Sequence, residues 1–112
     1  MRMNFEVTKN GTATVFKLKE QSLDSTIAPE LKGEFLLITR TKASQLVIDL
    51  SDVRSCDSSG LSALLIAERQ MRNHGGVVKL VGVRKTVLSL LKIAQLDRVF
   101  QIFPTVSEAL KV

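Results

Sequence analysis

The chain has 112 residues, of which 45% are hydrophobic and 24% charged, as expected for one globular domain. A single cysteine, Cys56, excludes an internal disulfide, and no apolar stretch approaches the ~20 residues that a membrane span needs. The net charge of +5 is compatible with an acidic partner, but the basic residues are scattered and Trp and Tyr are absent, so nucleic-acid binding is not expected.

A hairpin is predicted at the N-terminal end of the chain. Phe5 and Val7 alternate with polar residues, which predicts a short strand. Asn10 and Gly11 form a two-residue turn signal, and segment 12–18 follows as a second strand. These two strands are expected to pair antiparallel.

The first helix is predicted to follow the polar segment 24–26 and to end near Thr41. Pro29 lies in its first turn, where a proline is tolerated. The apolar face of this helix has helical spacing and consists of Ala28, Leu31, Phe35 and Ile38.

The middle of the chain predicts a strand–helix–strand unit. Segment 46–50 is almost continuously apolar, which is typical of a strand buried on both faces of a sheet. A polar loop over 51–59 leads to a helix over 61–73, which the glycines at 75–76 end. Segment 77–81 is a further strand, and strands joined in this way pair in parallel with a right-handed crossover.

The C-terminal part predicts a third helix over 86–94, a short strand or extended segment over 99–103 that Pro104 ends, and a short last helix over 107–112. Together these elements predict an α/β fold. It consists of a mixed sheet of four to five strands with about four helices packed on it, in a single domain that spans residues 1–112.

The polar loop before the second helix carries the strongest candidate site. Asp57, Ser58 and Ser59 are all good N-cap residues, so one of them has a structural role. A helix N-terminus also accommodates a phosphate, and a phosphorylated serine adds about two negative charges to a surface. Gly60 allows the backbone to approach closely at this turn. These features predict either a phosphorylation site or a helix cap with no further function.

Segment Asp57-Ser58-Ser59-Gly60-Leu61 resembles the phosphoacceptor motif of STAS domains, specifically that of bacterial anti-sigma factor antagonists. The resemblance covers almost the whole chain and continues in order through segments 23–31, 46–53, 80–83, 90–91 and 96–100. Several ordered matches over one chain identify a family more specifically than a single short motif does.

This resemblance implies a partner-switching mechanism. An unphosphorylated antagonist binds an anti-sigma factor that is also a serine kinase, and a sigma factor is released. The kinase phosphorylates the serine after the aspartate, which is Ser58 here, and a metal-dependent serine phosphatase reverses the modification. We expect two segments to emerge at one edge of the sheet and, with the exposed side of the second helix, to form the partner-binding surface. These segments are Asp24, Ser25 and Thr26, and Asp57, Ser58, Ser59, Gly60 and Leu61.

The chain departs from the family pattern in two places. Segment 20–22 differs from the Gly-Glu pair that often precedes the Leu-Asp of this loop. Gln95 stands where family members often have a glycine, and we interpret it as a changed helix cap. The altered loop leaves a second hypothesis open, namely a STAS subunit of a lipid transporter or of a larger signalling assembly that acts by protein binding.

No catalytic site, metal site or cofactor is predicted. An enzyme with Ser58 as nucleophile needs a nearby base, and the one histidine, His74, lies at the far end of the predicted helix, roughly 20 Å away. Cys56 is expected to pack as a small apolar residue. The first ten residues lack the apolar core of a secretory signal, so we expect a cytoplasmic protein that does not insert into a membrane.

Overall fold

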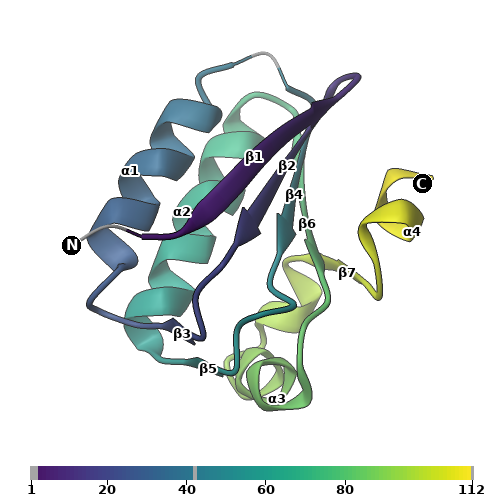
Figure 1. Ribbon diagram of the computed structural model, residues 1–112. Coiled ribbons are helices and arrows are strands. Elements are labelled where there is room, and N and C mark those ends of the chain that lie inside the picture. Colours follow the sequence, from purple (N-terminus) through teal and green to yellow (C-terminus); the bar gives the residue numbers. More distant parts are fainter. Residues whose placement is uncertain (1–2, 42, 112) are drawn as a thin grey trace.

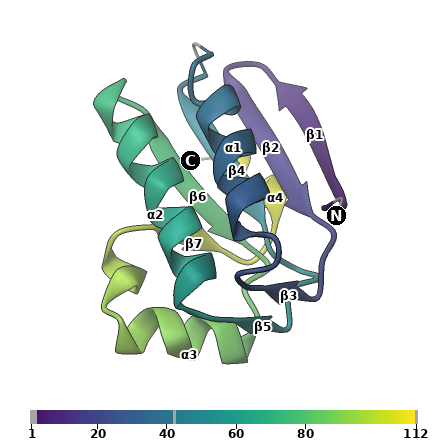
Figure 2. The ribbon, with the colours of Figure 1, turned by 90° about the vertical axis from the view of Figure 1, so that its left-hand side faces the viewer.

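The computed structural model describes residues 3–41 and 43–111. Its centre is a five-stranded sheet in the order β1-β2-β4-β6-β7, which Figures 1 and 2 show from two sides. The strands are β1 (Phe5–Asn10), β2 (Ala13–Leu18), β4 (Gln45–Asp49), β6 (Val77–Val81) and β7 (Gln101–Phe103).

The first two strands form the predicted hairpin. They pair antiparallel, with Asn10 opposite Ala13. Gly11 between them has a φ of 62°, a left-handed conformation that glycine adopts without strain. The other neighbouring strands pair in parallel. The α/β fold with a mixed sheet is therefore confirmed.

Two helices, α1 (Ala28–Ile38) and α2 (Ser58–Asn73), lie side by side on one face of the sheet (Figure 2). Side chains alternate between the faces along each strand, and those on this face form the main apolar core. The ring of Phe16 stacks on Phe5 with centroids 5.0 Å apart and meets Phe35 of α1 edge-on at 5.2 Å. This core fixes both helices against the strands.

The opposite face carries the short helix α4 (Val106–Leu110), seen on the other side of the sheet from α1 and α2 in Figure 1. Its Ala109 is buried in a small apolar cluster with Val47 and Val81. Lys79 is only 2% exposed, and its Nζ donates a hydrogen bond to the carbonyl of Ala109 over 2.7 Å. A buried lysine therefore anchors this helix to the sheet.

Helix α3 (Lys85–Ile93) lies at the end of the sheet, at the bottom of Figure 1, and the one-turn 3-10 helix η1 (Leu96–Arg98) follows it. Gln95 between them has a φ of 61° and is the only non-glycine residue with a positive φ within the described ranges. Since this conformation favours glycine, Gln95 is the changed helix cap that the sequence predicts.

A second, two-stranded sheet is absent from the sequence prediction. In this sheet β3 (Ser22–Leu23) pairs in parallel with β5 (Ser55–Cys56). The polar composition of 51–59 predicts only a loop, because strands of two residues are too short for a recognisable alternation. This small sheet positions the candidate site.

Other boundaries differ from the prediction by a few residues. Helix α2 begins at Ser58 instead of 61, because the apolar spacing starts only after its polar first turn. Helix α1 ends at Ile38, and the hydroxyl of Thr41 donates a hydrogen bond to the Ile38 carbonyl over 2.7 Å. The predicted last helix extends to Val112, which lies outside the described residues. None of the helices within those residues has the length and apolar character of a membrane span.

Candidate functional site

The small sheet brings the two predicted site segments together. Leu23 of β3 pairs with Cys56 of β5, and the carbonyl of Leu23 accepts a hydrogen bond from the N–H of Asp57 over 3.1 Å. The strands run in parallel, so Asp24 and Asp57 follow them at the same edge, where β3 and β5 lie side by side in both ribbon views. This common edge is the one that the sequence analysis expects.

Gly60 lets the start of α2 lie directly on β3. A Cβ atom at this position would lie 2.4 Å from the carbonyl oxygen of Leu23 and 2.9 Å from the Sγ of Cys56. Both distances are shorter than real Cβ contacts, and the carbonyl belongs to backbone that is held in the small sheet. Only glycine fits here, which confirms the close approach predicted for this turn.

Asp57 is the N-cap of α2. Its Oδ1 accepts a hydrogen bond from the N–H of Gly60 over 3.1 Å, as an N-cap side chain does with the third helical residue. Ser58 is the first helical residue and is exposed. Across the described residues, the N–H groups of Ser58 and Ser59 have no hydrogen-bond partner. The helix therefore starts with two unpaired N–H groups beside an exposed hydroxyl.

Asp24 holds its own segment in shape. Its Oδ1 accepts hydrogen bonds from the N–H of Thr26 over 3.0 Å and from the hydroxyl of Thr26 over 2.5 Å. The hydrogen bond from the hydroxyl, together with that from the N–H, lowers the pKa of the Asp24 carboxyl below its usual value. Asp24 is therefore a carboxylate at neutral pH, and Ser25 between the two residues is exposed.

Cys56 is half-buried beneath this edge. Burial raises the pKa of its thiol to about 11, and the neighbouring charge of Asp57 adds to the effect. The side chain is therefore a neutral thiol at physiological pH and packs against the main core, as the sequence analysis expects.

Two residues of the predicted partner-binding surface are buried and do not belong to the accessible surface. Gly60 is buried and Leu61 is only 8% exposed, because the first turn of α2 rests on β3. A partner therefore has little of either residue to touch, and their contribution is to position their neighbours. The accessible members are Asp24, Ser25, Thr26, Asp57, Ser58 and Ser59.

The single histidine lies at the other end of α2. His74 follows the last helical residue, and its Nδ1 lies 2.7 Å from the carbonyl of Gln70, to which it can donate a hydrogen bond. A helix rises about 1.5 Å per residue, so the length of α2 separates the imidazole from Ser58. The imidazole is therefore not placed to act as a base for the Ser58 hydroxyl.

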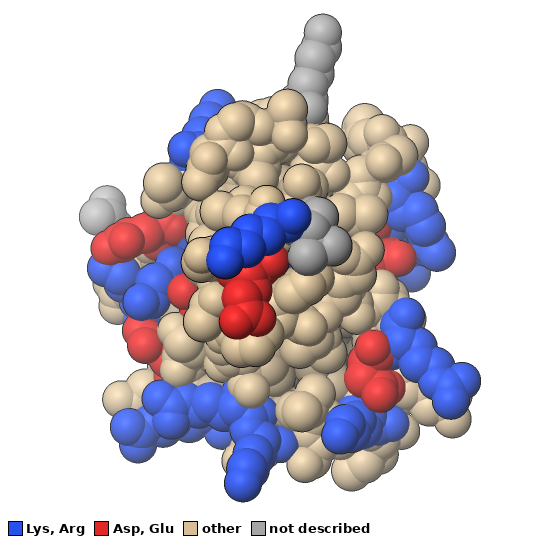
Figure 3. Space-filling view, turned by 90° about the vertical axis from the view of Figure 1, so that its right-hand side faces the viewer, with Lys and Arg blue, Asp and Glu red and all other residues tan. Residues whose placement is uncertain are grey.

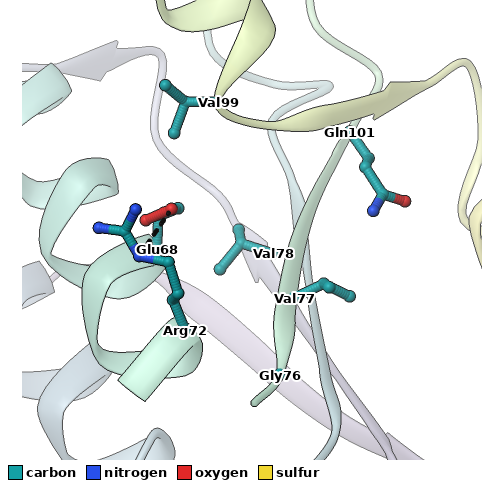
Figure 4. A pocket seen from close by; sticks show the side chains of 7 residues that line it. All are labelled: Glu68, Arg72, Gly76, Val77, Val78, Val99 and Gln101. Atoms are coloured by element: carbon teal, nitrogen blue, oxygen red, sulfur yellow. Dashed lines mark ion pairs between the residues drawn. The ribbon is translucent and has the colours of Figure 1, made fainter. Parts of the chain in front are cut away.

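A separate pocket lies at the edge of β6, toward that same end of α2 (Figure 4). Glu68 and Arg72 line it and form an ion pair over 3.6 Å. The remaining lining residues are Gly76, Val77, Val78, Val99 and Gln101. None of these seven residues is a serine, cysteine or histidine, so we assign no catalytic role to this pocket.

The sequence matches the STAS domain family over residues 4–109. The chain belongs to the STAS domain family. A Thermotoga neapolitana protein, named as a candidate anti-sigma factor antagonist, is 35% identical to this STAS domain over 68 residues. The match covers 61% of this chain and 60% of the relative, so it spans about three fifths of the relative's length.

Solved structures share the fold of this STAS domain. A candidate anti-sigma factor antagonist from Thermotoga maritima has a TM-score of 0.86 at 25% identity, over 96% of this chain and 92% of that one. The unphosphorylated anti-sigma factor antagonist SpoIIAA has a TM-score of 0.81 at 18% identity, over 96% and 94%. A sulfate transporter family protein from Wolinella succinogenes has a TM-score of 0.80 at 18% identity, over 93% and 86%. The last two likenesses show the fold alone.

Three basic residues at the same edge are not predicted from the sequence. Lys19, Arg54 and Arg84 line one depression there, although they lie far apart in the sequence. No local pattern connects them, and the only signal is that each comes shortly after a strand of the main sheet. Residues in such positions meet at the carboxyl edge of parallel strands.

Proposed function

We propose that this STAS domain is an anti-sigma factor antagonist that binds an anti-sigma factor serine kinase and is switched by phosphorylation of Ser58. The observation that carries the proposal is the exposed Ser58 hydroxyl at the first position of α2, directly after the capping Asp57. The name of the Thermotoga neapolitana relative supports the same class of function.

Ser58 suits a kinase better than its neighbour does. The transferred phosphoryl group and the attacking hydroxyl must come into line, which requires an accessible acceptor. Ser58 is exposed, whereas Ser59 is half-buried. We therefore propose Ser58 as the phosphorylated residue.

The start of α2 suits a phosphate on Ser58. The N–H groups of Ser58 and Ser59 are unpaired within the described residues, and the positive end of the helix dipole lies there. A bound partner meets close to two additional negative charges instead of a hydroxyl. Desolvating an unmatched charge costs several kcal/mol, which corresponds to a ~100-fold or larger loss of affinity. Phosphorylation thus controls the complex and leaves the domain folded.

The proposed contact surface consists of the accessible residues Asp24, Ser25, Thr26, Asp57, Ser58 and Ser59 together with the exposed side of α2. In this mechanism the unphosphorylated domain occupies the anti-sigma factor, and the sigma factor is released. A metal-dependent serine phosphatase restores the hydroxyl. We propose that these events take place in the cytoplasm and that the domain acts by binding, without catalysis of its own.

A phosphorylation assay tests the proposal. The protein is incubated with its cognate kinase and ATP, and the phosphate is located by mass spectrometry. We expect phosphate on Ser58 in the wild type and in the matched control Ser59→Ala, and none in Ser58→Ala. Phosphate on Ser59 alone, or on neither serine, contradicts the proposal.

A second candidate function is that of a STAS subunit in a lipid transporter or another larger assembly. The fold shared with a sulfate transporter family protein and the altered segment 20–22 favour this alternative. A pull-down with the Ser58→Ala protein as bait, from cells of its source, separates the two candidates. Recovery of a serine kinase supports the antagonist, and recovery of a transporter ATPase supports the alternative.

A further inference from the structure

The edge that carries Ser58 also holds a basic pocket that the phosphorylation switch does not use. Lys19 follows β2, Arg54 follows β4 and Arg84 follows β6, and all three line one depression of about 190 Å³. Figure 3 shows Lys and Arg side chains gathered along the lower edge of the molecule, at the level of α3 and β5 in Figure 1. The other lining residues are Glu20, Gln21 and Asp52.

Arg84 is held in a defined position. Its Nε donates a hydrogen bond to the carbonyl of Ser51 over 2.9 Å. Gly82 has a φ of 66° and lies so close to Ser51 that a Cβ on the glycine would be 2.8 Å from the Cβ of the serine. The loop after β6 is therefore fixed to the turn after β4. The terminal guanidinium N–H groups of Arg84 have no partner among the described residues.

Two charged groups of the basic pocket are already engaged. The ammonium group of Lys19 forms an ion pair with Glu6. The carboxylate of Glu20 accepts a hydrogen bond from the N–H of Asn4 over 2.7 Å. The charge of Lys19 is therefore largely neutralised, whereas Glu20 keeps its negative charge, because a backbone N–H is neutral.

In the part of the chain that the structure describes, the two arginines of the basic pocket have no carboxylate partner. Within residues 3–41 and 43–111, neither Arg54 nor Arg84 forms an ion pair. Among the described residues, the carboxylates of Glu20 and Asp52 line the same depression without forming an ion pair with either arginine. The lining holds three cationic and two anionic side chains, and the guanidinium groups of Arg54 and Arg84 remain available to an anionic group.

The basic pocket is continuous with the Ser58 surface through the small sheet. The carbonyl of Gln21 accepts hydrogen bonds from the N–H of Arg54 over 2.7 Å and from the N–H of Ser55 over 3.2 Å. Ser58 comes four residues after Arg54, and four residues of extended chain span at most ~14 Å. A protein seated on Ser58 therefore reaches the pocket.

We propose that the basic pocket binds carboxylate side chains from an acidic segment of the protein that contacts Ser58, an inference that rests on the proposed function. Guanidinium groups bind carboxylates through paired hydrogen bonds. The carboxylates of Glu20 and Asp52 in the wall repel a doubly charged phosphate more strongly than a singly charged carboxylate, which favours single carboxylate side chains over a phosphate ligand.

A titration of the full chain tests the pocket directly. The ¹⁵N-labelled protein is titrated at constant ionic strength with an acetylated tetraglutamate peptide and, in parallel, with inorganic phosphate. We expect saturable shifts in the side-chain N–H signals of Arg54 and Arg84 with the peptide. Arg54→Gln abolishes saturation, whereas Arg40→Gln, an exposed arginine at the opposite end, retains it. Equal effects of the two substitutions, or tighter binding of phosphate than of peptide, overturn the proposal.

A second measurement separates this proposal from the proposed function. The affinity for the anti-sigma factor kinase is measured at two salt concentrations. We expect Arg54→Gln to bind ~10-fold more weakly and with a smaller salt dependence, and Arg40→Gln to bind as the wild type does. If Ser58→Asp loses binding while Arg54→Gln binds normally, the switch stands and the pocket proposal is wrong. If the kinase does not bind the wild type, the proposed function fails, and the peptide titration alone decides whether the pocket binds carboxylates.

Discussion

At the end of the domain that carries Ser58, Cβ atoms on Gly60 and Gly82 would lie 2.4 Å and 2.8 Å from their nearest neighbours. At the opposite end, Gly11 and Gly75 have φ values of 62° and 78°, and a Cβ on either would meet nothing within 4 Å. A Cβ on Gly76 at that end would lie 2.8 Å from the Cε of Met71 and 3.0 Å from the carbonyl oxygen of Ser44. Glycine therefore allows the closest approach of two backbone segments at the first end, whereas Gly11 and Gly75 at the second serve a change of chain direction.

The difference shows how a surface made of loops acquires a fixed shape. At the Ser58 end, hydrogen bonds between β3 and β5 and the contact at Gly60 join two loops into one unit. A charge added to Ser58 would therefore lie on a surface that hydrogen bonds and close packing hold in place. The turns at the opposite end are also joined by backbone hydrogen bonds, such as that from the N–H of Val77 to the carbonyl of Ser44 over 3.1 Å, but none of the predicted site residues lies there.

The largest expected effect concerns binding at the fixed surface. Phosphorylated wild type is expected to bind the kinase ~100-fold more weakly or worse, and Ser58→Asp to reproduce part of this loss, because a carboxylate carries less charge than a phosphate. The melting temperature should be unchanged or slightly higher, since a negative charge at a helix N-terminus contributes ~0.3–1 kcal/mol. Affinity and thermal melting are measured together on the wild type, Ser58→Ala and Ser58→Asp.

Two outcomes contradict this prediction. Unchanged affinity in both the phosphorylated wild type and Ser58→Asp excludes the switch. A Ser58→Asp protein that loses binding only because it unfolds leaves the site correct and the mechanism wrong. Ser58→Ala is expected to bind the partner and to resist the kinase.

Removing the close approach at Gly60 is expected to destabilise the fold. Gly60→Ala places a Cβ against the Leu23 carbonyl, and we expect a loss of ~1–3 kcal/mol in the free energy of unfolding, as for an overpacked core. The control is Gly33→Ala in α1, where a Cβ would meet nothing within 4 Å. That substitution should stabilise the protein by ~0.5–1 kcal/mol. Chemical denaturation measures both, and equal effects contradict the role assigned to Gly60.

Local patterns predicted the parts of the fold that depend on neighbours in sequence. Asn10 and Gly11 indicate the hairpin, and the apolar run 46–50 indicates a buried strand, because turn residues and hydrophobic periodicity act over a few residues. Asp57 could be predicted only as one of three possible caps, since the choice depends on where the backbone of α2 begins.

The remaining features depend on contacts between distant segments. The need for glycine at position 60 arises from Leu23, and the burial of Leu61 follows from the same contact. The sequence placed both residues on the partner surface, because a polar loop gives no sign that it rests on a second small sheet. The basic pocket likewise exists only once three strands have placed Lys19, Arg54 and Arg84 together.

A change at Asp24 tests whether the second loop contributes to the shared surface. Asp24→Ala is expected to weaken kinase binding by ~1–3 kcal/mol, as for a lost hydrogen bond to a charged group. Because Asp24 also holds Thr26, the matched control is Asp24→Asn, which keeps an acceptor for both Thr26 donors and loses only the charge. Isothermal titration calorimetry compares the three proteins. Wild-type affinity in a folded Asp24→Ala protein removes this loop from the interface.

The pH dependence of the same loop follows from its hydrogen bonds. The hydroxyl and the N–H of Thr26 lower the pKa of Asp24, so the stability they provide is present above the unfolded pKa and is lost as pH falls through the folded one. Thr26→Val removes the hydroxyl but keeps the N–H, and should raise the pKa of Asp24 part of the way to its usual value. Carboxyl ¹³C shifts between about pH 2 and 5 measure the change. An identical midpoint in both proteins contradicts the assigned cause.

The smallest expected effect concerns Gln95, where glycine would be favoured by the backbone conformation alone and not by a close approach. Gln95 has a φ of 61°, a conformation that costs a residue with a Cβ about 1 kcal/mol or more. Glycine has no Cβ and relieves this strain. Glycine also makes the unfolded chain more flexible, so the net stabilisation expected for Gln95→Gly is only ~0.5–1 kcal/mol. The matched control is Ala94→Gly at the neighbouring residue, which has an ordinary helical φ of −80° and should lose ~0.5–1 kcal/mol. If thermal or chemical unfolding shows that Gln95→Gly gains stability and Ala94→Gly loses it, backbone conformation alone determines which residue is preferred at position 95. A loss of stability in both variants would show that the Gln95 side chain makes a contribution larger than the strain it carries.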